Sequence, residues 1–119
     1  MLLGFIDSTV GDEPFLVIGH SYGGYLARAI ANRRADQAVG LALICPVGAH
    51  TRDVPQPVLV LAGRQDATAG HTGPWELVEH YPRATFAVLD SAGHALLHEQ
   101  PDLVQALFAE WLTRVRERF

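Results

Sequence analysis

Four short runs of apolar residues, none alternating with polar ones, constrain the fold of this sequence most strongly. The runs are Phe15 to Ile18, Leu41 to Ile44, Val58 to Ala62 and Thr85 to Leu89. Strands that are buried on both faces show such unbroken apolar runs, whereas strands with one solvent-exposed face alternate apolar with polar residues. Coverage on both faces is typical of parallel sheets, because their crossover connections carry helices to the two faces. We therefore predict an α/β fold with a small four-stranded parallel sheet flanked by helices.

Helical patterns lie between or beside most of these runs. The predicted helices are an opening one around Leu2 to Val10, and others over Tyr22 to about Arg34, Trp75 to about His80 and Pro101 to Phe119. The last is the clearest, because its apolar residues keep a spacing of three or four residues along its whole length. Between the second and third apolar runs, the segment from Pro46 to Pro57 shows no helical period. It just reaches the length of about a dozen residues that a parallel crossover needs.

Composition limits the class of protein. A chain of 119 residues, 49% of them hydrophobic and 18% charged, suits a single globular domain over residues 1–119. A formal net charge of -4 argues against nucleic acid and acidic membrane surfaces as partners. No signal peptide is recognisable, and no apolar stretch approaches the roughly 20 residues that span a bilayer. We expect a soluble cytoplasmic protein whose single cysteine, Cys45, is a buried small hydrophobe.

A tight turn from strand to helix is predicted at Gly19-His20-Ser21-Tyr22-Gly23, directly after the first apolar run. Such a turn strains the serine backbone, and glycines two residues before and after it remove Cβ atoms that would collide. The turn lifts the Ser21 hydroxyl above the end of the sheet. It also leaves the backbone N–H of Tyr22 pointing to the place where an oxyanion would form.

Polar residues follow two further strands at the point where each strand is predicted to end. Asp66 comes just after the third apolar run, and His94 lies a few residues after the fourth. The carboxyl ends of parallel strands share one edge of the sheet, where the functional crevice of such folds lies. Ser21, Asp66 and His94 are therefore expected to converge. His94 would take the proton of Ser21, and Asp66 would fix the imidazole tautomer and stabilise the imidazolium.

Other residues compete for these roles. Asp90 also sits at a strand end, although a loop-capping role suits it better, and Asp53 lies in the irregular connection. His98 and Glu99 near His94 suggest a metal site, but no third ligand stands at a fitting spacing, so we expect no metal. The side chain of His20 is expected to point away from Ser21 and to support packing.

The chain resembles the α/β-hydrolase family in three segments. These are Gly19-His20-Ser21-Tyr22-Gly23-Gly24, Leu61-Ala62-Gly63-Arg64-Gln65-Asp66 and Ala92-Gly93-His94. The resemblance covers essentially the whole chain but only about the second half of the family's fold, without the cap domain. It implies a truncated, minimal hydrolase with a Ser21, His94 and Asp66 triad and with Tyr22 as one oxyanion-hole donor. No residue matches the second donor.

The resemblance also implies a reaction. We expect an esterase-like serine hydrolase that cleaves small or short-chain carboxylic esters without a cofactor, because an uncapped site is open and shallow. Tyr22 and Trp75 are the candidates for lining the acyl pocket. The competing class is an inactive, truncated hydrolase that serves as an oligomerising module, and the missing donor motivates it.

The expected topology bears on assembly. In the family the last four strands are neighbours in sequence order, which leaves the strand from Phe15 to Ile18 as an open edge. An open edge is a template for pairing. We therefore predict a homodimer, with the first strand of one copy meeting the first strand of the other.

Overall fold

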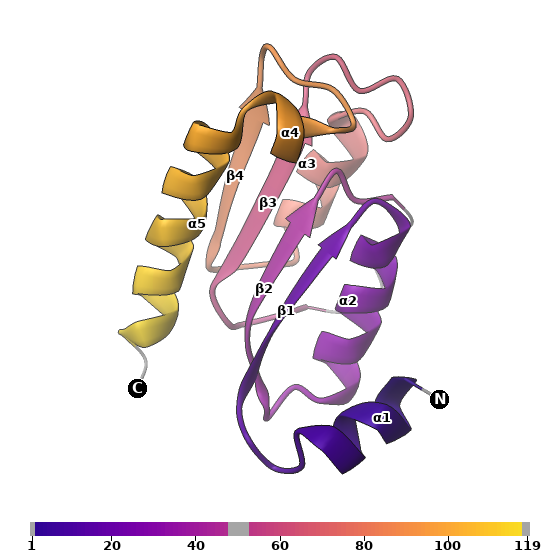
Figure 1. Cartoon of the computed structure of the whole chain (residues 1–119), viewed down its shortest axis with the longest axis vertical. Helices are drawn as coiled ribbons and strands as arrows, with labels where there is room; N and C mark the ends of the chain where they lie inside the picture. The colour runs from indigo at the N-terminus through magenta and orange to yellow at the C-terminus, as the bar shows by residue number, and fades with distance from the viewer. Residues whose placement is uncertain (1, 48–52, 118–119) are drawn as a thin grey trace.

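The computed structural model describes residues 2–47 and 53–117, and it contains one sheet of four parallel strands with helices on both faces (Figure 1). The strands are β1 Phe15–His20, β2 Ala38–Ile44, β3 Val58–Gly63 and β4 Ala84–Leu89, and they pair in chain order. The helices are α1 Leu2–Thr9, α2 Tyr22–Arg33, α3 Thr72–Val78, α4 Leu96–Glu99 and α5 Pro101–Arg116. The predicted α/β class and the four-stranded parallel sheet are confirmed.

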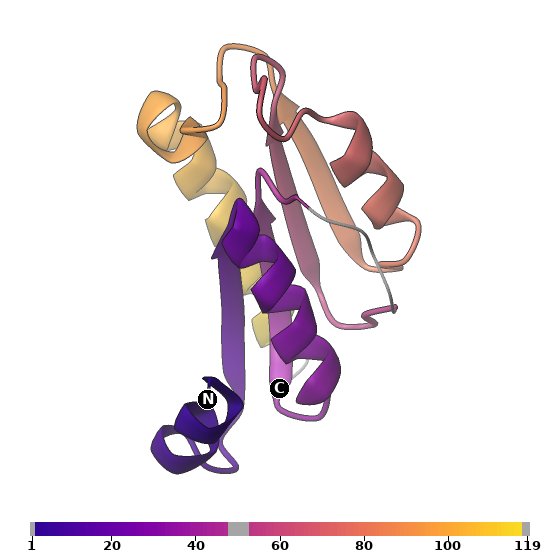
Figure 2. The same cartoon turned by 90° about the vertical axis from the view of Figure 1, so that its right-hand side faces the viewer.

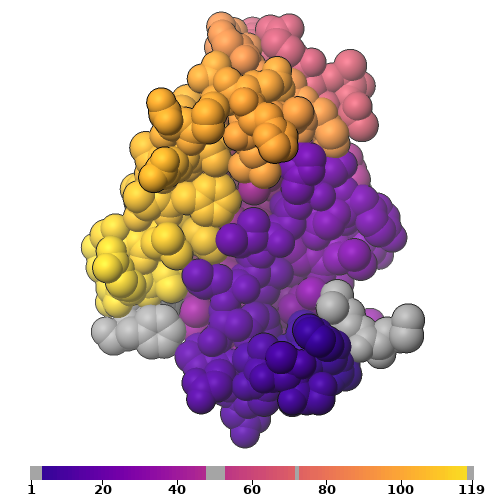
Figure 3. Space-filling model, viewed as in Figure 1, coloured from indigo at the N-terminus to yellow at the C-terminus, as the bar shows by residue number. Residues whose placement is uncertain are grey.

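The central and edge strands differ in how they are covered. All of β3 is buried and nearly all of β2, as the non-alternating apolar runs predicted. The edge strand β1 instead alternates, with Val17 and Gly19 buried and Leu16, Ile18 and His20 exposed. The reason is that α2 covers one face of β1, whereas no described element covers its other face (Figures 1 and 3). The run from Phe15 to Ile18 is thus apolar without being covered on both faces.

Two hydrophobic clusters fill the space between the sheet and the helices. One lies between the sheet and the segments α2 and α3, and it includes Ala27, Ala31 and Leu77. The other lies under α4 and α5, and its centre is Trp111, which is fully buried. Figure 2 shows α2 and α3 on one side of the sheet and α5 on the other. The Trp111 indole N–H donates to the Pro57 carbonyl at 3.0 Å, so the largest side chain of this cluster has its polar atom satisfied.

The described helices match the sequence prediction with two exceptions. The last two residues of the helix predicted from Pro101 to Phe119 lie outside the described residues, and α5 ends at Arg116. Helix α3 begins at Thr72, so that Pro74 is its third residue, where a missing N–H costs no helical bond. The one-turn helix α4 was not predicted, since four residues carry no readable period. Part of the segment from Pro46 to Pro57 lies outside the described residues, and its described parts contain no helix or strand. None of the described helices has both the length and the apolar character that a membrane span requires.

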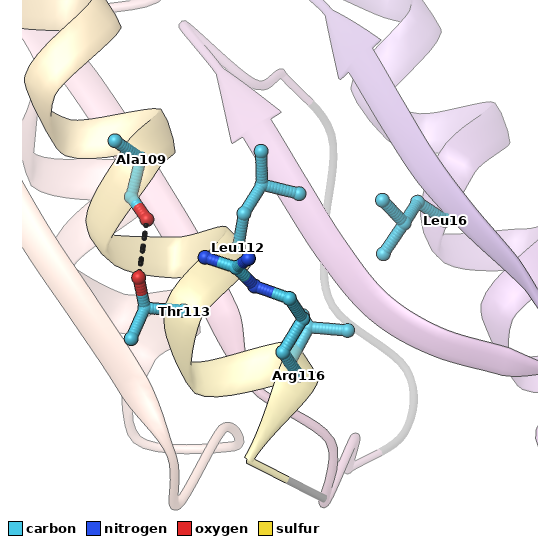
Figure 4. A pocket seen from close by; sticks show the side chains of 6 residues that line it. Leu16, Ala109, Leu112, Thr113 and Arg116 are labelled. Carbon is cyan, nitrogen blue, oxygen red and sulfur yellow. Dashed lines mark hydrogen bonds between the residues drawn. The ribbon is translucent and has the colours of Figure 1, made fainter. Parts of the chain in front are cut away.

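A groove runs between the uncovered face of β1 and helix α5 (Figure 4). Its volume is about 460 Å³, and Leu16 of β1 faces Leu112, Val115 and Arg116 of α5 across it. Leu16 is 39% exposed and Ile18, further along β1, is 55% exposed. Apolar side chains therefore line the outer edge of the sheet on the α5 side.

Candidate active site

Ser21 occupies a strained turn between β1 and α2. Its backbone has φ 56° and ψ −122°, in the left-handed half of conformational space that residues other than glycine rarely enter. Two backbone hydrogen bonds hold it there: the Ser21 N–H donates to the Ile44 carbonyl at 2.8 Å, and the Gly24 N–H donates to the Ser21 carbonyl at 2.9 Å. A conformation of this kind costs about 1–3 kcal/mol and persists only where the surroundings over-determine it.

The two glycines that flank Ser21 are not equivalent. A Cβ on Gly19 would collide with the Gly23 carbonyl and would lie 2.8 Å from the Cβ of Ala27. A Cβ on Gly23 would meet no heavy atom within 4 Å. The expectation that both glycines avoid a collision is therefore correct for Gly19 and wrong for Gly23. The reason is that Gly19 faces the first turn of α2, whereas Gly23 faces open space.

This difference predicts opposite effects of one substitution. Gly19→Ala should destabilise the fold by about 2 kcal/mol, because the turn of α2 must move to admit the methyl group. Gly23→Ala should be neutral or stabilising by up to about 1 kcal/mol, because alanine favours helix. Urea denaturation of the two variants measures the difference. Equal midpoints would contradict the proposed packing of the turn.

Asp66 lies in the turn after β3, and its side chain is fully buried. One carboxylate oxygen accepts the backbone N–H groups of Thr68 and Ala69, both at 2.8 Å, and the other faces His94. Burial by itself raises the pKa of the Asp66 carboxyl, but the Ala69 N–H, the His94 side chain and the Thr68 N–H together hold that pKa below its ordinary value. Asp66 is thus an ionised carboxylate with a fixed orientation.

His94 lies in the loop between β4 and α4, which arches over the carboxyl end of the sheet (Figure 1). Gly63 lets this loop come close to β3, since a Cβ there would lie 2.6 Å from the Ala92 carbonyl oxygen. The loop is tied down by the Gln65 N–H, which donates to that carbonyl at 2.9 Å, and by the Gly93 N–H, which donates to Glu99 Oε1 at 2.9 Å. The His94 ring is therefore carried by a well-anchored backbone.

Ser21, His94 and Asp66 form one chain of hydrogen bonds. His94 Nδ1 lies 2.8 Å from Asp66 Oδ2, and His94 Nε2 lies 2.7 Å from Ser21 Oγ. A carboxylate can only accept, so Nδ1 carries the proton and Nε2 presents its lone pair to the serine hydroxyl. This arrangement suits the removal of a proton from Ser21, with Asp66 stabilising the imidazolium that results.

The N-terminus of α2 lies directly after Ser21. Tyr22 is the first residue of α2, so its backbone N–H has no acceptor within the helix, and the partial positive charge of the helix end favours an anion there. The Tyr22 side chain is exposed and its ring stacks on that of Tyr25 at a centroid distance of 5.8 Å. Both rings are exposed, and Tyr22 directly follows Ser21 in the chain.

The remaining candidates lie elsewhere. Asp90 is exposed and 4.0 Å from Arg64, so it does not cap the loop as expected. Asp53 pairs with His80 at 3.1 Å.

The Trp75 ring packs 5.5 Å from that of Phe86 in β4, on the sheet edge opposite β1, so the structure does not bring Trp75 to Ser21.

Two residues near His94 were not assigned to the site from the sequence. His20 Nε2 lies 2.8 Å from the His94 carbonyl oxygen, so His20 contacts the site rather than only supporting packing. Cys45 is fully buried, directly after β2, and its Sγ lies 3.7 Å from the Gly93 carbonyl oxygen. Its position at the end of a strand of a parallel sheet is a signal that could have placed it there.

Cys45, Asp66 and His94 are also the group of possible metal ligands among the described residues, with ligand atoms within 4.8 Å of one another. Burial, and then the neighbouring Asp66 charge, raise the pKa of the Cys45 thiol to about 12. A neutral thiol is a poor ligand, because the thiolate is the form that binds metal. Asp66 and His94 already bond to each other, so the geometry favours the hydrogen-bonded chain.

A strained serine between strand and helix, with an acid and a histidine after later strands of the same parallel sheet, is the arrangement that defines the α/β hydrolases. The chain has the α/β-hydrolase fold, which confirms the resemblance seen in its sequence. An α/β superfamily hydrolase from Oenococcus oeni superposes with a TM-score of 0.88 at 21% identity, over 97% of this chain and 72% of the other. A thermophilic esterase from Thermogutta terrifontis superposes with a TM-score of 0.82 at 18% identity, over 96% of this chain and 70% of the esterase.

Sequence comparison finds a lipase among the proteins similar to this chain. The chain is 34% identical over 77 residues to the lipase LipV of Mycobacterium tuberculosis. That match covers 58% of this chain and 30% of the lipase, so the chain spans less than a third of that protein's length. No protein-family model matches the sequence.

Proposed function

We propose that this protein is a serine hydrolase that cleaves small or short-chain carboxylic esters through an acyl-enzyme. The observation that carries the proposal is the continuous chain of hydrogen bonds from Ser21 through His94 to the buried Asp66. The lipase and esterase names of similar proteins support the reaction class. No cofactor enters the proposed reaction.

The mechanism follows from these contacts. Ser21 Oγ attacks the ester carbonyl carbon while its proton passes to His94 Nε2, and the Asp66 carboxylate stabilises the imidazolium. The Tyr22 N–H donates to the oxyanion. The alcohol then leaves with the proton from His94, and the acyl group remains on Ser21. Water, deprotonated by His94, attacks the acyl carbon and releases the carboxylic acid.

The site has one assigned oxyanion donor, which sets an expected rate. Removal of one such donor costs about 10²–10³ in kcat in well-equipped hydrolases. We therefore expect low turnover unless a second donor is supplied. The exposed ring of Tyr22, the residue after Ser21, stacks on that of Tyr25, and the two rings offer an apolar surface for a short acyl chain.

Labelling with a fluorophosphonate tests the proposal without knowledge of the natural substrate. An activated serine attacks the phosphorus and displaces fluoride, so the expected result is one adduct, which peptide mass spectrometry maps to Ser21. Hydrolysis of p-nitrophenyl butyrate should accompany it. The absence of an adduct on Ser21 would favour the competing class, an inactive module that acts through assembly.

We also propose that the partner of this chain is a second copy. The edge strand β1 offers unpaired backbone groups, and the groove between Leu16 and Leu112 lies beside it (Figure 4). A two-fold axis at this edge would pair the two β1 strands antiparallel and bury Leu16 and Ile18 of both copies. The two Ser21 residues would then face opposite ends of a continuous sheet, so each copy would keep its own site.

Sedimentation measures this assembly. We expect a dimer at micromolar concentration for the native chain and a monomer for Ile18→Asp, because a charge would be buried at the axis. Leu26→Asp is the control, since Leu26 is an exposed residue of α2, on the opposite face. A native chain that sediments as a monomer would contradict the pairing.

A further inference from the structure

His20 is the last residue of β1 and directly precedes Ser21. Its Nε2 lies 2.8 Å from the backbone carbonyl oxygen of His94, and the two imidazole rings lie 5.1 Å apart at 47°. A carbonyl oxygen can only accept, so the Nε2–H of His20 donates this hydrogen bond. Two consecutive residues of the chain therefore contact His94: Ser21 contacts the ring, and His20 contacts the backbone.

The other hydrogen bonds of the His94 loop come from different parts of the fold. Gln65 after β3 holds the Ala92 carbonyl, Glu99 of α4 holds the Gly93 N–H, and the Cys45 thiol after β2 lies near the Gly93 carbonyl. The Gln65 and Cys45 contacts hold the loop to the ends of the central strands β3 and β2, and the Glu99 contact holds it to α4. The nucleophile, however, stands on the edge strand β1. Among the hydrogen bonds of the described residues, the His20 bond is the one that joins the loop backbone to that strand.

We infer that His20 is a positioning residue that sets the distance between Ser21 Oγ and His94 Nε2; this inference rests on the proposed function. Asp66 holds one corner of the His94 ring, at Nδ1, and the ring can still turn about that point if its backbone shifts. His20 removes this freedom by tying the His94 carbonyl to the residue next to the nucleophile. Displacement of a reacting group by about 1 Å costs on the order of 10²-fold in rate, so a single bond of this kind affects turnover.

Two features of His20 are separable by substitution: its N–H donor and its ring. His20→Gln keeps a donor at a similar distance from the backbone and removes the ring. His20→Phe keeps a ring beside His94 and removes the donor. Because His20 is exposed, neither substitution disturbs a hydrophobic cluster, and both variants should keep the melting temperature of the native chain.

Kinetics with p-nitrophenyl butyrate and fluorophosphonate give the first measurement. His20→Phe should lower kcat and the rate of labelling by about 10- to 100-fold with an unchanged KM, because the contact affects proton transfer and not ester binding. His20→Gln should stay within about threefold of the native chain, because the donor is retained. Equal rates in all three proteins, equal losses in both variants, or a larger loss in His20→Gln would each overturn the inference.

Amide hydrogen exchange gives a measurement that does not depend on activity. The peptide that spans residues 91–98 should exchange faster in His20→Phe than in the native chain, and at the native rate in His20→Gln. If Ser21 of the native chain is not labelled, the proposed function fails, and exchange still decides whether His20 holds the loop. Native exchange rates in His20→Phe would overturn the inference.

Discussion

Ser21→Ala should abolish ester hydrolysis above the background of the assay. Removal of the nucleophile from a fully equipped serine hydrolase costs about 10⁶-fold in kcat. The present site starts from one assigned oxyanion donor, which lowers the initial rate by about 10²–10³, so a loss of at least about 10³-fold is expected. The loss should appear in kcat, because the methyl group of alanine leaves the surface that binds the ester in place.

Ser8→Ala is the matched control for this experiment. The Ser8 hydroxyl donates to the Phe5 carbonyl at 3.1 Å in α1, near the opposite end of β1 (Figure 1). Ser8→Ala and Ser21→Ala each remove one hydroxyl oxygen, so the two variants differ only in the position of that oxygen. Rates that are equal in Ser21→Ala and the native chain would mean that the observed turnover belongs to another group or to a contaminant.

Asp66→Asn should produce the second largest loss. An amide at this position would accept the N–H groups of Thr68 and Ala69 with its oxygen and turn its NH₂ group toward His94. Nδ1 would then have to accept, and the imidazole proton would move to Nε2, where it faces Ser21 and blocks proton transfer. In a comparable hydrolase the acid contributes about 10²-fold less than the nucleophile, so the residual activity should exceed that of Ser21→Ala by up to about 10²-fold.

Asp90→Asn separates this effect from a general change of charge. Asp90 also follows a strand directly, yet its carboxylate is 86% exposed and lies beside Arg64. It should retain native turnover. A loss in Asp90→Asn as large as that in Asp66→Asn would show that the wrong carboxylate has been assigned.

Asp66 also links stability to pH. Its folded-state pKa is held below the ordinary value, so its ionised form stabilises the fold at pH values above the ordinary carboxyl range. That contribution disappears as the pH falls through the depressed folded-state pKa. The stability of Asp66→Asn should therefore vary less with pH in the acid range than that of the native chain.

The central sheet was predictable because its signal is local. Unbroken apolar runs define β2 and β3 as buried on both faces, and Gly-His-Ser-Tyr-Gly marks the turn that holds Ser21. The covering of β1 was not predictable from its own residues, because Leu16 and Ile18 have the composition of buried residues and are left bare by the topology. Apolar composition allows burial, but a neighbouring element is needed to provide it.

The site was predictable because the apolar runs of the sequence indicate where the strands end. Ser21, Asp66 and His94 each follow a strand, and a parallel sheet brings such positions together. The contact of His20 with the His94 carbonyl could not be predicted, because it depends on the path of a loop that has no regular structure. The position of Trp75 against Phe86 was not predictable either, because it depends on how α3 packs against β4.

The nucleophile of this site follows β1, an edge strand with one open face. In a single copy β1 is paired on one side only and its Leu16 face is open. Asp66 instead follows the fully buried β3, and His94 lies in a loop that Gln65 and Glu99 hold. Fraying of the edge strand would carry Ser21 away while the carboxylate and imidazole stayed joined. Heating should therefore inactivate the protein reversibly before the whole sheet unfolds. A compound bound to Ser21 should raise the temperature at which β1 frays.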